Sequence, residues 1–454
     1  MFELAFMLLA GGFSFWAVVL GNQSRLRRWQ SAAESCGLRV EEISSPRAWR
    51  MRLHARAEPL EVWIESAGRN QRAVRITIAV PGPPGFSGVR IRRESLRSRG
   101  AREIEVGDEI FDDMFFVEGP RRLVFTLLDA ETRGLLRNIN ALGPLGIAGG
   151  EVRAEMSESL LDSVLPMLLD VGRRFTQRVD VVQGLARNAG EDSEAGVRLS
   201  NLLLLAREFP GEPGTLETIR NAAWSDPSLE IKLRAASEMG VEGHTVLVEL
   251  AESPVDDLVS SQAVSALGQN LPFERVRAIL DFSLRRRHLQ TARACLEALG
   301  SSGDAADVDR LAKVMTLEQG ELAPAAALAL GATGCAAAEP PLILALQGEK
   351  TDDVRVAAAS ALGRVGSTAA VLPLKEATER AAGNPELLRA LRQAIAEIQS
   401  RLPGASPGQL SLAGVEVGQL SLAQAEAGQL SLAADPAGQL SLQPKEQRNR
   451  LNPV

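Results

Sequence analysis

A sequence motif that recurs about every 31 residues limits what the middle of this chain can fold into. The motif is a short run rich in alanine and leucine that ends in glycine. Its five copies end at Gly240, Gly268, Gly300, Gly331 and Gly363, which are 28, 32, 31 and 32 residues apart. Repetition at one period is the signature of a solenoid, in which each unit packs only on its neighbours. We therefore expect an array of similar units.

Each unit is predicted to be a pair of helices. In the last copy, apolar side chains from Val354 to Leu362 recur at three- and four-residue spacing and so share one face of a helix. Gly363 is expected to end this helix with a positive φ. Pro373 fits the first turn of a second helix, which carries its own apolar stripe. Neither helix can bury its stripe alone, so the units must stack.

The residues of the last copy carry a family resemblance. The run DVRVAAASALG at 353–363 resembles the HEAT repeat of the short bacterial type, the phycobilisome-lyase HEAT-like repeat. The resemblance covers about 225–400 and is clearest at 351–378. It implies an α-solenoid with a concave surface that binds proteins, and it does not imply lyase activity.

Exposed polar residues at the ends of the array's helices are the candidates for protein binding. They are Asp256, Asp257, Asp352, Asp353 and Arg355. The alternative is that these residues cap helices and pair neighbouring repeats. Residues 225–400 carry 24 acidic and 17 basic side chains. Phosphate binding requires the opposite sign, so we expect no nucleic acid and favour a basic or amphipathic segment of a partner protein.

The sequence offers no arrangement of residues typical of a catalytic, cofactor or metal site. Cys36, Cys295 and Cys335 exclude a disulfide framework, and no Cys/His spacing fits zinc. The acidic cluster at 108–113 lacks the EF-hand pattern, and its interleaved phenylalanines favour a loop held by buried rings. We expect no cofactor, no small-molecule ligand and no enzymatic activity. The alternative is a bilin-lyase-like or unknown activity in the domain at 30–155.

The N-terminus is predicted to be a membrane anchor, residues 1–22. Leu4 to Leu20 is a run of 17 uncharged, mostly apolar residues, which as a helix is about 26 Å long and close to the hydrocarbon thickness. Arg25, Arg27 and Arg28 follow at once. The positive-inside bias then predicts a single-pass protein with the bulk of the chain in the cytoplasm. A cleaved signal peptide and a buried helix are the alternatives.

A small α+β domain is predicted over 30–155. Apolar and polar residues alternate in segments typical of half-buried strands, at 49–54, 60–65, 74–78 and 89–92. A helix is expected from Arg121 to Asn138, and Gly149-Gly150 is typical of a hairpin turn. Residues 156–210 show two helical patterns and are assigned to a helical connector. The Pro/Gly-rich break at 210–214 precedes the solenoid.

The tail repeats a pentapeptide. GQLSL begins at Gly408, Gly418, Gly428 and Gly438, with a period of ten. An even period keeps the leucines on one side of a strand but not on one face of a helix. One hypothesis is a disordered tail whose copies add as strands to the sheet edge of a partner. Its candidate docking residues are Leu410, Leu412, Leu420 and Leu422. The alternative is a tandem DNA expansion without a partner.

Together these patterns predict a mainly α protein. It is an α-solenoid of HEAT-like helix pairs preceded by a transmembrane helix and a small α+β domain, and followed by a disordered repeat tail. The predicted segments are 1–22, 30–155, 156–210, 215–402 and 403–454. The expected function is that of a membrane-anchored cytoplasmic scaffold that binds partner proteins through the solenoid and the tail.

Overall fold

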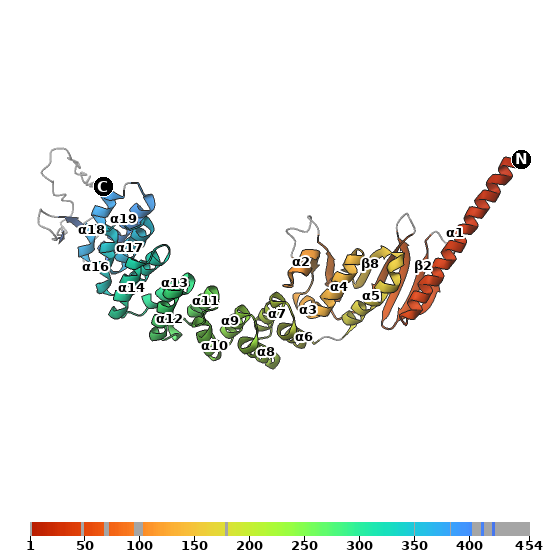
Figure 1. Ribbon diagram of the computed structural model, residues 1–454, viewed down its shortest axis with the longest axis horizontal. Helices are drawn as coiled ribbons and strands as arrows, with labels where there is room; N and C mark the ends of the chain where they lie inside the picture. Colours follow the sequence, from red (N-terminus) through yellow and green to blue (C-terminus); the bar gives the residue numbers. More distant parts are fainter. Residues whose placement is uncertain are drawn as a thin grey trace, which may run out of the picture. The chain divides into compact units, whose positions relative to one another are not determined.

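The computed structural model describes residues 2–46, 50–67, 72–94, 103–177, 180–348, 350–381, 383–401, 410–412 and 420–422. Of residues 2–15 and 17, and of the last two segments, it describes the backbone alone. The chain forms two compact units, residues 1–295 and 296–454. Figure 1 shows that the first unit begins with a long helix and a sheet, which helix pairs follow in chain order.

Helix α1 (Phe2–Ser35) packs its second half on the sheet domain. Trp29 is buried and donates a hydrogen bond to Glu158 at 2.9 Å, and Arg25 forms an ion pair with the same carboxylate at 2.6 Å. Earlier in the helix, Trp16 and Leu20 are exposed. Within the described part of the chain, no helix is long and apolar enough to cross a membrane. Most side chains of the predicted anchor lie outside that part.

The first unit contains an eight-stranded antiparallel sheet in the order β1-β2-β3-β4-β8-β7-β5-β6. Alternate residues of each central strand face the core, as in β3, where Leu60, Val62 and Ile64 are fully buried. The strands are β1 (Arg39–Ile43), β2 (Arg52–Ala57), β3 (Leu60–Ala67), β4 (Ala73–Ala79), β5 (Arg90–Arg93), β6 (Phe115–Glu118), β7 (Leu145–Ala148) and β8 (Glu151–Ser157).

Helix α5 covers the centre of the sheet, on β3, β4 and β8. Gly172 of α5 permits a close approach, because a Cβ there would lie 3.0 Å from a methyl group of Leu60. Helix α4 packs on α5 and β7. The helices of this domain are α2 (Glu109–Met114), α3 (Arg121–Leu127), α4 (Ala130–Leu142) and α5 (Leu161–Thr176).

The strand predictions are confirmed, and one helix prediction is wrong. The four alternating segments correspond to β2, β3, β4 and β5, and the turn at Gly149-Gly150 joins β7 to β8 with positive φ at both glycines. The single helix expected from Arg121 to Asn138 is instead two helices, α3 and α4. Asp129 causes the break, because its side chain caps α4 by accepting a hydrogen bond from the Thr132 amide at 2.8 Å.

Helix pairs begin directly after α5. Helix α6 packs on α7, α8 on α9, and α10 on α11, while α7, α9 and α11 contact one another in series. The pair α6–α7 lies in the segment 156–210, where the sequence predicts a connector, and it packs on α8. The helices are α6 (Val181–Glu191), α7 (Ala195–Glu208), α8 (Pro213–Ser225), α9 (Leu229–Glu238), α10 (His244–Ala251), α11 (Asp257–Leu267), α12 (Phe273–Arg286) and α13 (Leu289–Gly300).

The second unit continues the same pattern of helix pairs. Helix α15 packs on α17 and α17 on α19, while α16 packs on α18. The predicted inward residues of α17 and α18 are buried, from Val354 to Leu362 and from Ala370 to Ala377. The helices are α14 (Ala305–Leu317), α15 (Leu322–Ala332), α16 (Glu339–Gln347), α17 (Asp352–Val365), α18 (Val371–Arg380) and α19 (Pro385–Ser400). We call α9, α11, α13, α15 and α17, which hold the repeated motif, the motif helices.

Short 3-10 helices stand at several turns. They are η1 (Phe86–Gly88), η2 (Glu158–Leu160), η3 (Gly240–Gly243), η4 (Gly268–Asn270), η5 (Ala336–Ala338) and η6 (Thr368–Ala370). Four of them, η3 to η6, lead from a motif helix toward the next helix. They turn the chain back between the motif helix and the helix that follows it.

The motif glycines serve two different purposes. Gly240 and Gly268 follow their helices with φ of 59° and 49°, as a helix-ending glycine should. Gly331 and Gly363 instead lie inside their helices, so the prediction that Gly363 ends α17 with a positive φ is wrong. A Cβ at Gly331 would lie 2.6 Å from the Cα of Ala361. There the glycine lets adjacent motif helices touch.

Two copies of the tail pentapeptide form strands. Strands β9 (Leu410–Leu412) and β10 (Leu420–Leu422) pair in antiparallel fashion. The period-two strand interpretation therefore holds for these two copies. The rest of the predicted disordered tail, including the third and fourth copies, lies outside the described residues.

Candidate protein-binding edge

The predicted candidate Asp256 caps its own helix. It directly precedes α11, and its Oδ1 accepts hydrogen bonds from the amides of Leu258 at 2.9 Å and Val259 at 3.1 Å. Two of the free amides at the start of α11 are satisfied in this way. Asp256 itself remains exposed.

Asp257 joins one repeat to the next. It is the first residue of α11, yet its carboxylate accepts hydrogen bonds from the amides of Gln290 at 3.0 Å and Thr291 at 2.8 Å, and from the Thr291 hydroxyl at 2.7 Å. These donors stand in the first turn of α13. Burial opposes ionisation of Asp257, but the hydrogen bonds from Thr291 and Gln290, with the charge of His288, outweigh it and lower its pKa.

The candidates of the second unit gather in the first turn of α17. Asp352 accepts a hydrogen bond from Asn384 at 2.9 Å, and Asn384 in turn caps α19. Arg355 stands 3.5 Å from Asp352, in the same turn. Asp353 is exposed beside them. The contacts of Asp352 with Asn384 and of Asp257 with α13 are thus inter-repeat contacts, and a role of the five candidates in binding stays a prediction.

The turns that lead into α9, α11 and α13 expose large apolar side chains. Trp224, in the last turn of α8, is 46% exposed, and Val255, two residues before α11, is 76% exposed. Leu258 in the first turn of α11 and Leu289 at the start of α13 are about half exposed. These turns follow one another along the same edge of the stacked helices, because α9 packs on α11 and Asp257 bonds to α13. We call this edge, with Trp224, Val255, Leu258 and Leu289, the turn edge.

Carboxylates accompany the apolar residues of the turn edge. Glu230, Glu252 and Asp256 are exposed at its first two turns, and Glu252 forms an exposed ion pair with Arg275 at 3.0 Å. Apolar side chains supply most of the free energy of a protein interface, and surrounding charges select the partner. An edge of this composition suits a segment that presents both apolar and basic side chains.

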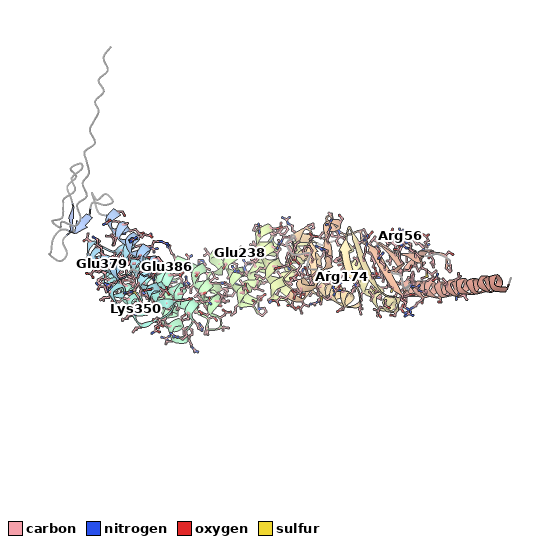
Figure 2. All side chains as sticks on the ribbon, turned by 90° about the horizontal axis from the view of Figure 1, so that it is seen from above. Arg56, Arg174, Glu238, Lys350, Glu379 and Glu386 are labelled. Atoms are coloured by element: carbon pink, nitrogen blue, oxygen red, sulfur yellow. The ribbon has the colours of Figure 1, made fainter. Side chains whose placement is uncertain are left out.

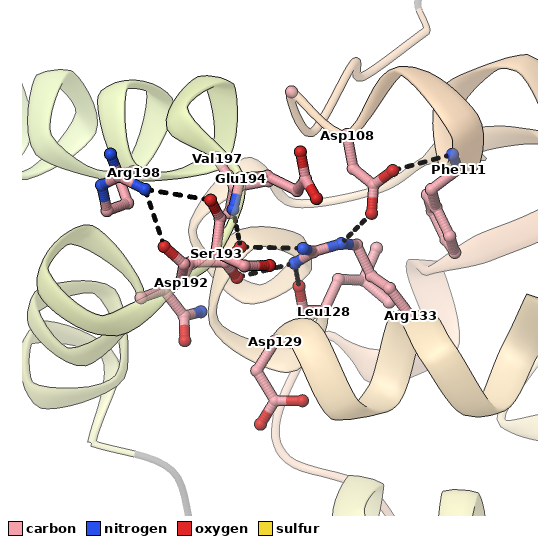
Figure 3. A network of polar contacts seen from close by, with 12 residues as sticks. Asp108, Phe111, Leu128, Asp129, Arg133, Asp192, Ser193, Glu194, Val197 and Arg198 are labelled. Atoms are coloured by element: carbon pink, nitrogen blue, oxygen red, sulfur yellow. Dashed lines mark hydrogen bonds and ion pairs between the residues drawn. The ribbon is translucent and has the colours of Figure 1, made fainter. Parts of the chain in front are cut away.

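A buried ion-pair network fastens the sheet domain to the helix pairs. Arg133, in α4, is 1% exposed and contacts two buried aspartates (Figure 3). Its Nε donates to Asp108 at 2.8 Å, and its two Nη atoms donate to both oxygens of Asp192 at 2.9 Å. Asp108 caps α2, and Asp192 precedes α7. The bidentate geometry fixes the orientation of α4 against the start of α7.

A second buried ion pair connects α7 to the start of α9. We call these two contacts, Arg133 with Asp108 and Asp192 and Arg198 with Asp226, the two joints. Arg198, in α7, donates to both oxygens of the buried Asp226 at 2.8 and 3.0 Å, and its Nη1 also donates to the carbonyl of Asp192 at 2.9 Å. Arg133 and Arg198 are each the fourth residue of their helix. Asp192 and Asp226 each stand three residues before the next helix. The ion pair between the sheet domain and the start of α7 is thus of the same kind as the ion pair between α7 and the start of α9.

Contacts in the two joints shift the pKa values of Asp108 and Arg198. Burial opposes ionisation of Asp108, but the hydrogen bonds from Arg133 and from the Phe111 amide, with the charges of Arg133 and Arg137, outweigh it and lower its pKa. The hydrogen bond to Asp226 raises the pKa of Arg198. A buried pair of this kind contributes little net stability, but removal of one partner leaves the other charge buried and unpaired.

Two glycines let the joint close. A Cβ at Gly107, whose φ is 94°, would lie 2.4 Å from the carbonyl carbon of Gly196. A Cβ at Gly196 would in turn lie 2.3 Å from the Gly107 carbonyl oxygen. The loop before α2 can therefore touch the first turn of α7 only when neither residue has a side chain.

A polar cleft of about 840 Å³ adjoins the joint, between α4, α5 and α6. Arg174 of α5, labelled in Figure 2, contacts Glu131 closely and lies 3.6 Å from Asp129. Arg187 lies 3.6 Å from the same Asp129 oxygen. Both arginines that line the cleft are thus paired with carboxylates, and an anionic ligand would have to displace one of these pairs.

The acidic cluster at 108–113 caps and closes a loop. Asp108 holds Arg133, and Asp112 accepts hydrogen bonds from the amides of Val106 and Gly107 at 3.0 and 2.9 Å. Phe111 is fully buried, as the interpretation of a loop held by buried rings predicts. Within the described residues, no group of three or more His, Cys, Asp or Glu side chains is placed to hold a metal ion.

The joint was not predicted from the sequence, although a signal for part of it is present. Val197-Arg198 is the same pair as Val354-Arg355 of the clearest repeat, and Asp226 follows Arg198 by 28 residues, one repeat length. Extending the repeat register toward the N-terminus would have found the second joint. Arg133 offered no such signal, because it lies 59 residues from Asp192 in a different kind of domain.

Comparisons with known proteins agree with the repeat assignment. Residues 354–380 match the family described as "PBS lyase HEAT-like repeat". No curated protein matches the chain. Among solved structures, human deoxyhypusine hydroxylase in complex with glycerol is similar at 20% identity over 48% of this chain and 96% of that chain, with a TM-score of 0.21, which is too low to support any argument. The matched repeat and the stacked helix pairs support a HEAT-repeat protein.

Proposed function

We propose that this chain is a scaffold that binds a basic, amphipathic segment of a partner protein along its turn edge. We further propose that α1 tethers it to a membrane, with the bulk of the chain in the cytoplasm. The observation that carries the first proposal is the exposure of Trp224, Val255, Leu258 and Leu289 at three successive turns.

The turn edge suits binding because its frame is rigid. Each of its turns is fixed by the contacts that hold neighbouring repeats together, such as Asp226 with Arg198 and Asp257 with Thr291. Preorganised side chains lose little conformational entropy on binding, so exposed apolar groups on such a frame contribute more of their burial free energy to affinity. Trp224 is the expected anchor, because tryptophan is enriched among the residues that dominate interfaces.

The tether rests on the sequence of α1 and on the exposure of its described apolar residues. Leu4 to Leu20 is uncharged, and Trp16, Val18 and Leu20 are exposed. The helix then continues without interruption into the segment that docks on the sheet domain through Trp29. A membrane-embedded first half would therefore hold the sheet domain close to the bilayer surface.

The binding proposal is tested by capture of partners from native membranes with three forms of the full chain. One is the wild type, one carries Trp224→Ser, Val255→Ser and Leu258→Ser, and one carries the matched control Leu203→Ser and Leu216→Ser. The control removes exposed leucines of α7 and α8 that are not part of the turn edge. The turn-edge variant is expected to lose at least about tenfold of the captured partner, equivalent to roughly 1.4 kcal/mol, and the control to lose less than about twofold.

Retention of every partner by the turn-edge variant, with an unchanged melting temperature, would disprove the proposed binding edge. The tether is tested separately, by flotation of the full chain and of a chain that lacks residues 1–22 with liposomes. Flotation of both chains, or of neither, would contradict the role of α1. The two outcomes are independent, because the truncation leaves Trp29 and its contact with Glu158 in place.

A further inference from the structure

Backbone amides at each turn of the turn edge are bonded within the chain. Asp256 accepts hydrogen bonds from two amides at the start of α11, and Asp257 from two amides at the start of α13. At the first turn, the Ser228 amide donates to Asp226 at 2.8 Å. Residues 224–291 are all described, and they form helices and turns but no strand. A partner segment in an extended conformation therefore finds no strand edge to join there.

The absence of a strand along residues 224–291 decides which backbone conformation suits a partner segment. An extended segment gains affinity by adding its main-chain hydrogen bonds to a sheet edge. Without that edge, its amides and carbonyls lose water on binding and gain no partner, which costs free energy. A helix bonds its own backbone groups, except at its ends. It therefore brings only side chains to the exposed apolar residues of the turn edge.

The distance between successive turns sets the spacing of apolar residues on such a helix. Stacked helices lie about 8–10 Å apart, so the turns that lead into α9, α11 and α13 recur at about that distance. Residues seven apart on a helix are about 10.5 Å apart and lie on the same face. A helix that runs along the edge thus places one apolar residue at each turn, against Trp224, then Val255 and Leu258, then Leu289.

The exposed charges change sign along the turn edge. Glu230 and Asp256 are exposed at the first two turns. Arg285 and Arg286 are exposed at the third turn, where they stand in the last turn of α12. Complementary charges across an interface favour a partner, and like charges disfavour it. A partner helix therefore needs basic residues over the first two turns and acidic residues over the third.

We propose that the occupant of the turn edge is an α-helix of the partner protein that lies along the three turns. Its apolar residues stand seven apart, its basic residues meet the first two turns, and its acidic end meets the third. This inference rests on the proposed binding at the turn edge and specifies what binds there. A helix with the opposite charges would place acids on Glu230 and Asp256 and bases on Arg285 and Arg286.

The test uses three synthetic peptides of about 18 residues, long enough as helices to span the three turns. The matched peptide has leucines seven residues apart, lysines along most of its length and glutamates at one end. The second has the same sequence with a central proline, which breaks a helix. The third exchanges lysine and glutamate throughout. Each carries a dye and is titrated with the full-length chain in one detergent, and fluorescence anisotropy measures its affinity.

The matched peptide is expected to bind at least about tenfold more tightly than either of the other two. Its affinity should fall at least about tenfold for the chain with Trp224→Ser, Val255→Ser and Leu258→Ser, since these are the apolar contacts. For the control chain with Leu203→Ser and Leu216→Ser it should fall less than about twofold. Circular dichroism of the mixture should show a gain in helix when the matched peptide binds.

Equal affinity of the matched and proline peptides would overturn the helical occupant. Equal affinity of the charge-exchanged peptide would overturn the proposed charges, and failure of all three peptides to bind would overturn the inference as a whole. Partner capture from native membranes separates these results from a failure of the proposed function. Capture that depends on the turn edge, together with peptides that fail, would leave the binding edge in place and reject only the helix.

Discussion

Repeats near the sheet domain are joined differently from repeats in the second unit. The starts of α4, α7 and α9 are connected by buried charges, with Arg133 on Asp192 and Arg198 on Asp226. From α15 to α19 the adjacent helices α15, α17 and α19 touch through glycine and alanine, with Gly331 against Ala361 and Gly363 against Ala394. Both regions stack helix pairs in the same order, so one architecture is reached with two kinds of contact.

The two kinds of contact differ in how strictly they fix the position of a helix. Buried ion pairs are directional, and they strongly penalise a helix that is out of place, although their net contribution to stability is small. Glycine–alanine contacts gain dispersion energy from close packing and carry no charge. Arg355 shows the transition between them. It is the fourth residue of α17, as Arg133 and Arg198 are of their helices, but within the described residues its ion pair is with Asp352 of its own turn.

Replacement of Arg133 should give the largest effect. Arg133→Met leaves Asp108 and Asp192 buried without their common partner, and such a loss destabilises by roughly 3–5 kcal/mol. The matched control is Arg137→Met, which removes a half-exposed arginine 3.5 Å from Asp108 and should cost below about 1 kcal/mol. Urea unfolding, with hydrogen exchange in α4 and α7, measures both. Equal effects of the two variants would show that the joint does not depend on buried charge.

Substitution of a motif glycine should give the next largest effect and sharpen the packing side of the comparison. Gly331→Ala places a Cβ 2.6 Å from the Cα of Ala361, so the helices must separate, at a cost of about 1–3 kcal/mol. Gly190→Ala is the control, because Gly190 is also helical but has open space around it. It should stabilise by up to about 1 kcal/mol. Thermal unfolding of both variants shows whether each substitution raises or lowers stability. Stabilisation by Gly331→Ala would contradict the close contact.

Removal of an inter-repeat cap should have a smaller effect. Asp257→Ala deprives the start of α13 of its acceptor and should cost about 1–2 kcal/mol. Asp353→Ala is the control, since Asp353 is exposed in the first turn of α17, and it should stay within about 0.5 kcal/mol. Denaturant midpoints measure both. If Asp353→Ala proved the more harmful, Asp257 would not be the link between these repeats.

Mild acid should produce the smallest loss of stability, and only in the helices that are held by the carboxylates of Asp108 and Asp257. The pKa values of Asp108 and Asp257 are lowered in the folded chain. Their contribution is therefore complete above the ordinary aspartate pKa of about 3.9 and is lost as the pH falls through the lower folded values. Hydrogen exchange between pH 5 and about 3 should show α4, α7 and α13 lose protection before α15 and α17. Simultaneous loss in both regions would remove the proposed difference.

The sequence predicted the repeats and the strands because periodicity alone decides them. The alternation of apolar and polar residues from Leu60 to Ile64 predicts a half-buried strand, whichever elements lie beside it. The role of Gly363 could not be predicted in the same way. Whether a glycine ends a helix or admits a neighbour depends on what stands beside it, and a Cβ at Gly363 would lie 3.2 Å from the Cα of Ala394.

The joint was harder to predict because its partners belong to different repeats or domains. Asp108 and Asp192 show no shared pattern until Arg133 brings them together. Asp257 was predicted as a candidate for binding, with inter-repeat pairing as the alternative. Its contacts with Thr291 show that pairing, and they follow from a register that one sequence does not reveal.

The matching positions of Arg133 and Arg198 bear on how the length of this chain can change over evolutionary time. A duplicated segment that runs from just after Asp192 to Asp226 would bring its own arginine and its own aspartate. It would therefore join the preceding repeat and receive the next one without any new contact. The contact between the sheet domain and the start of α7 would be preserved throughout. Gain or loss of whole helix pairs at this end is then a single genetic step that preserves every joint.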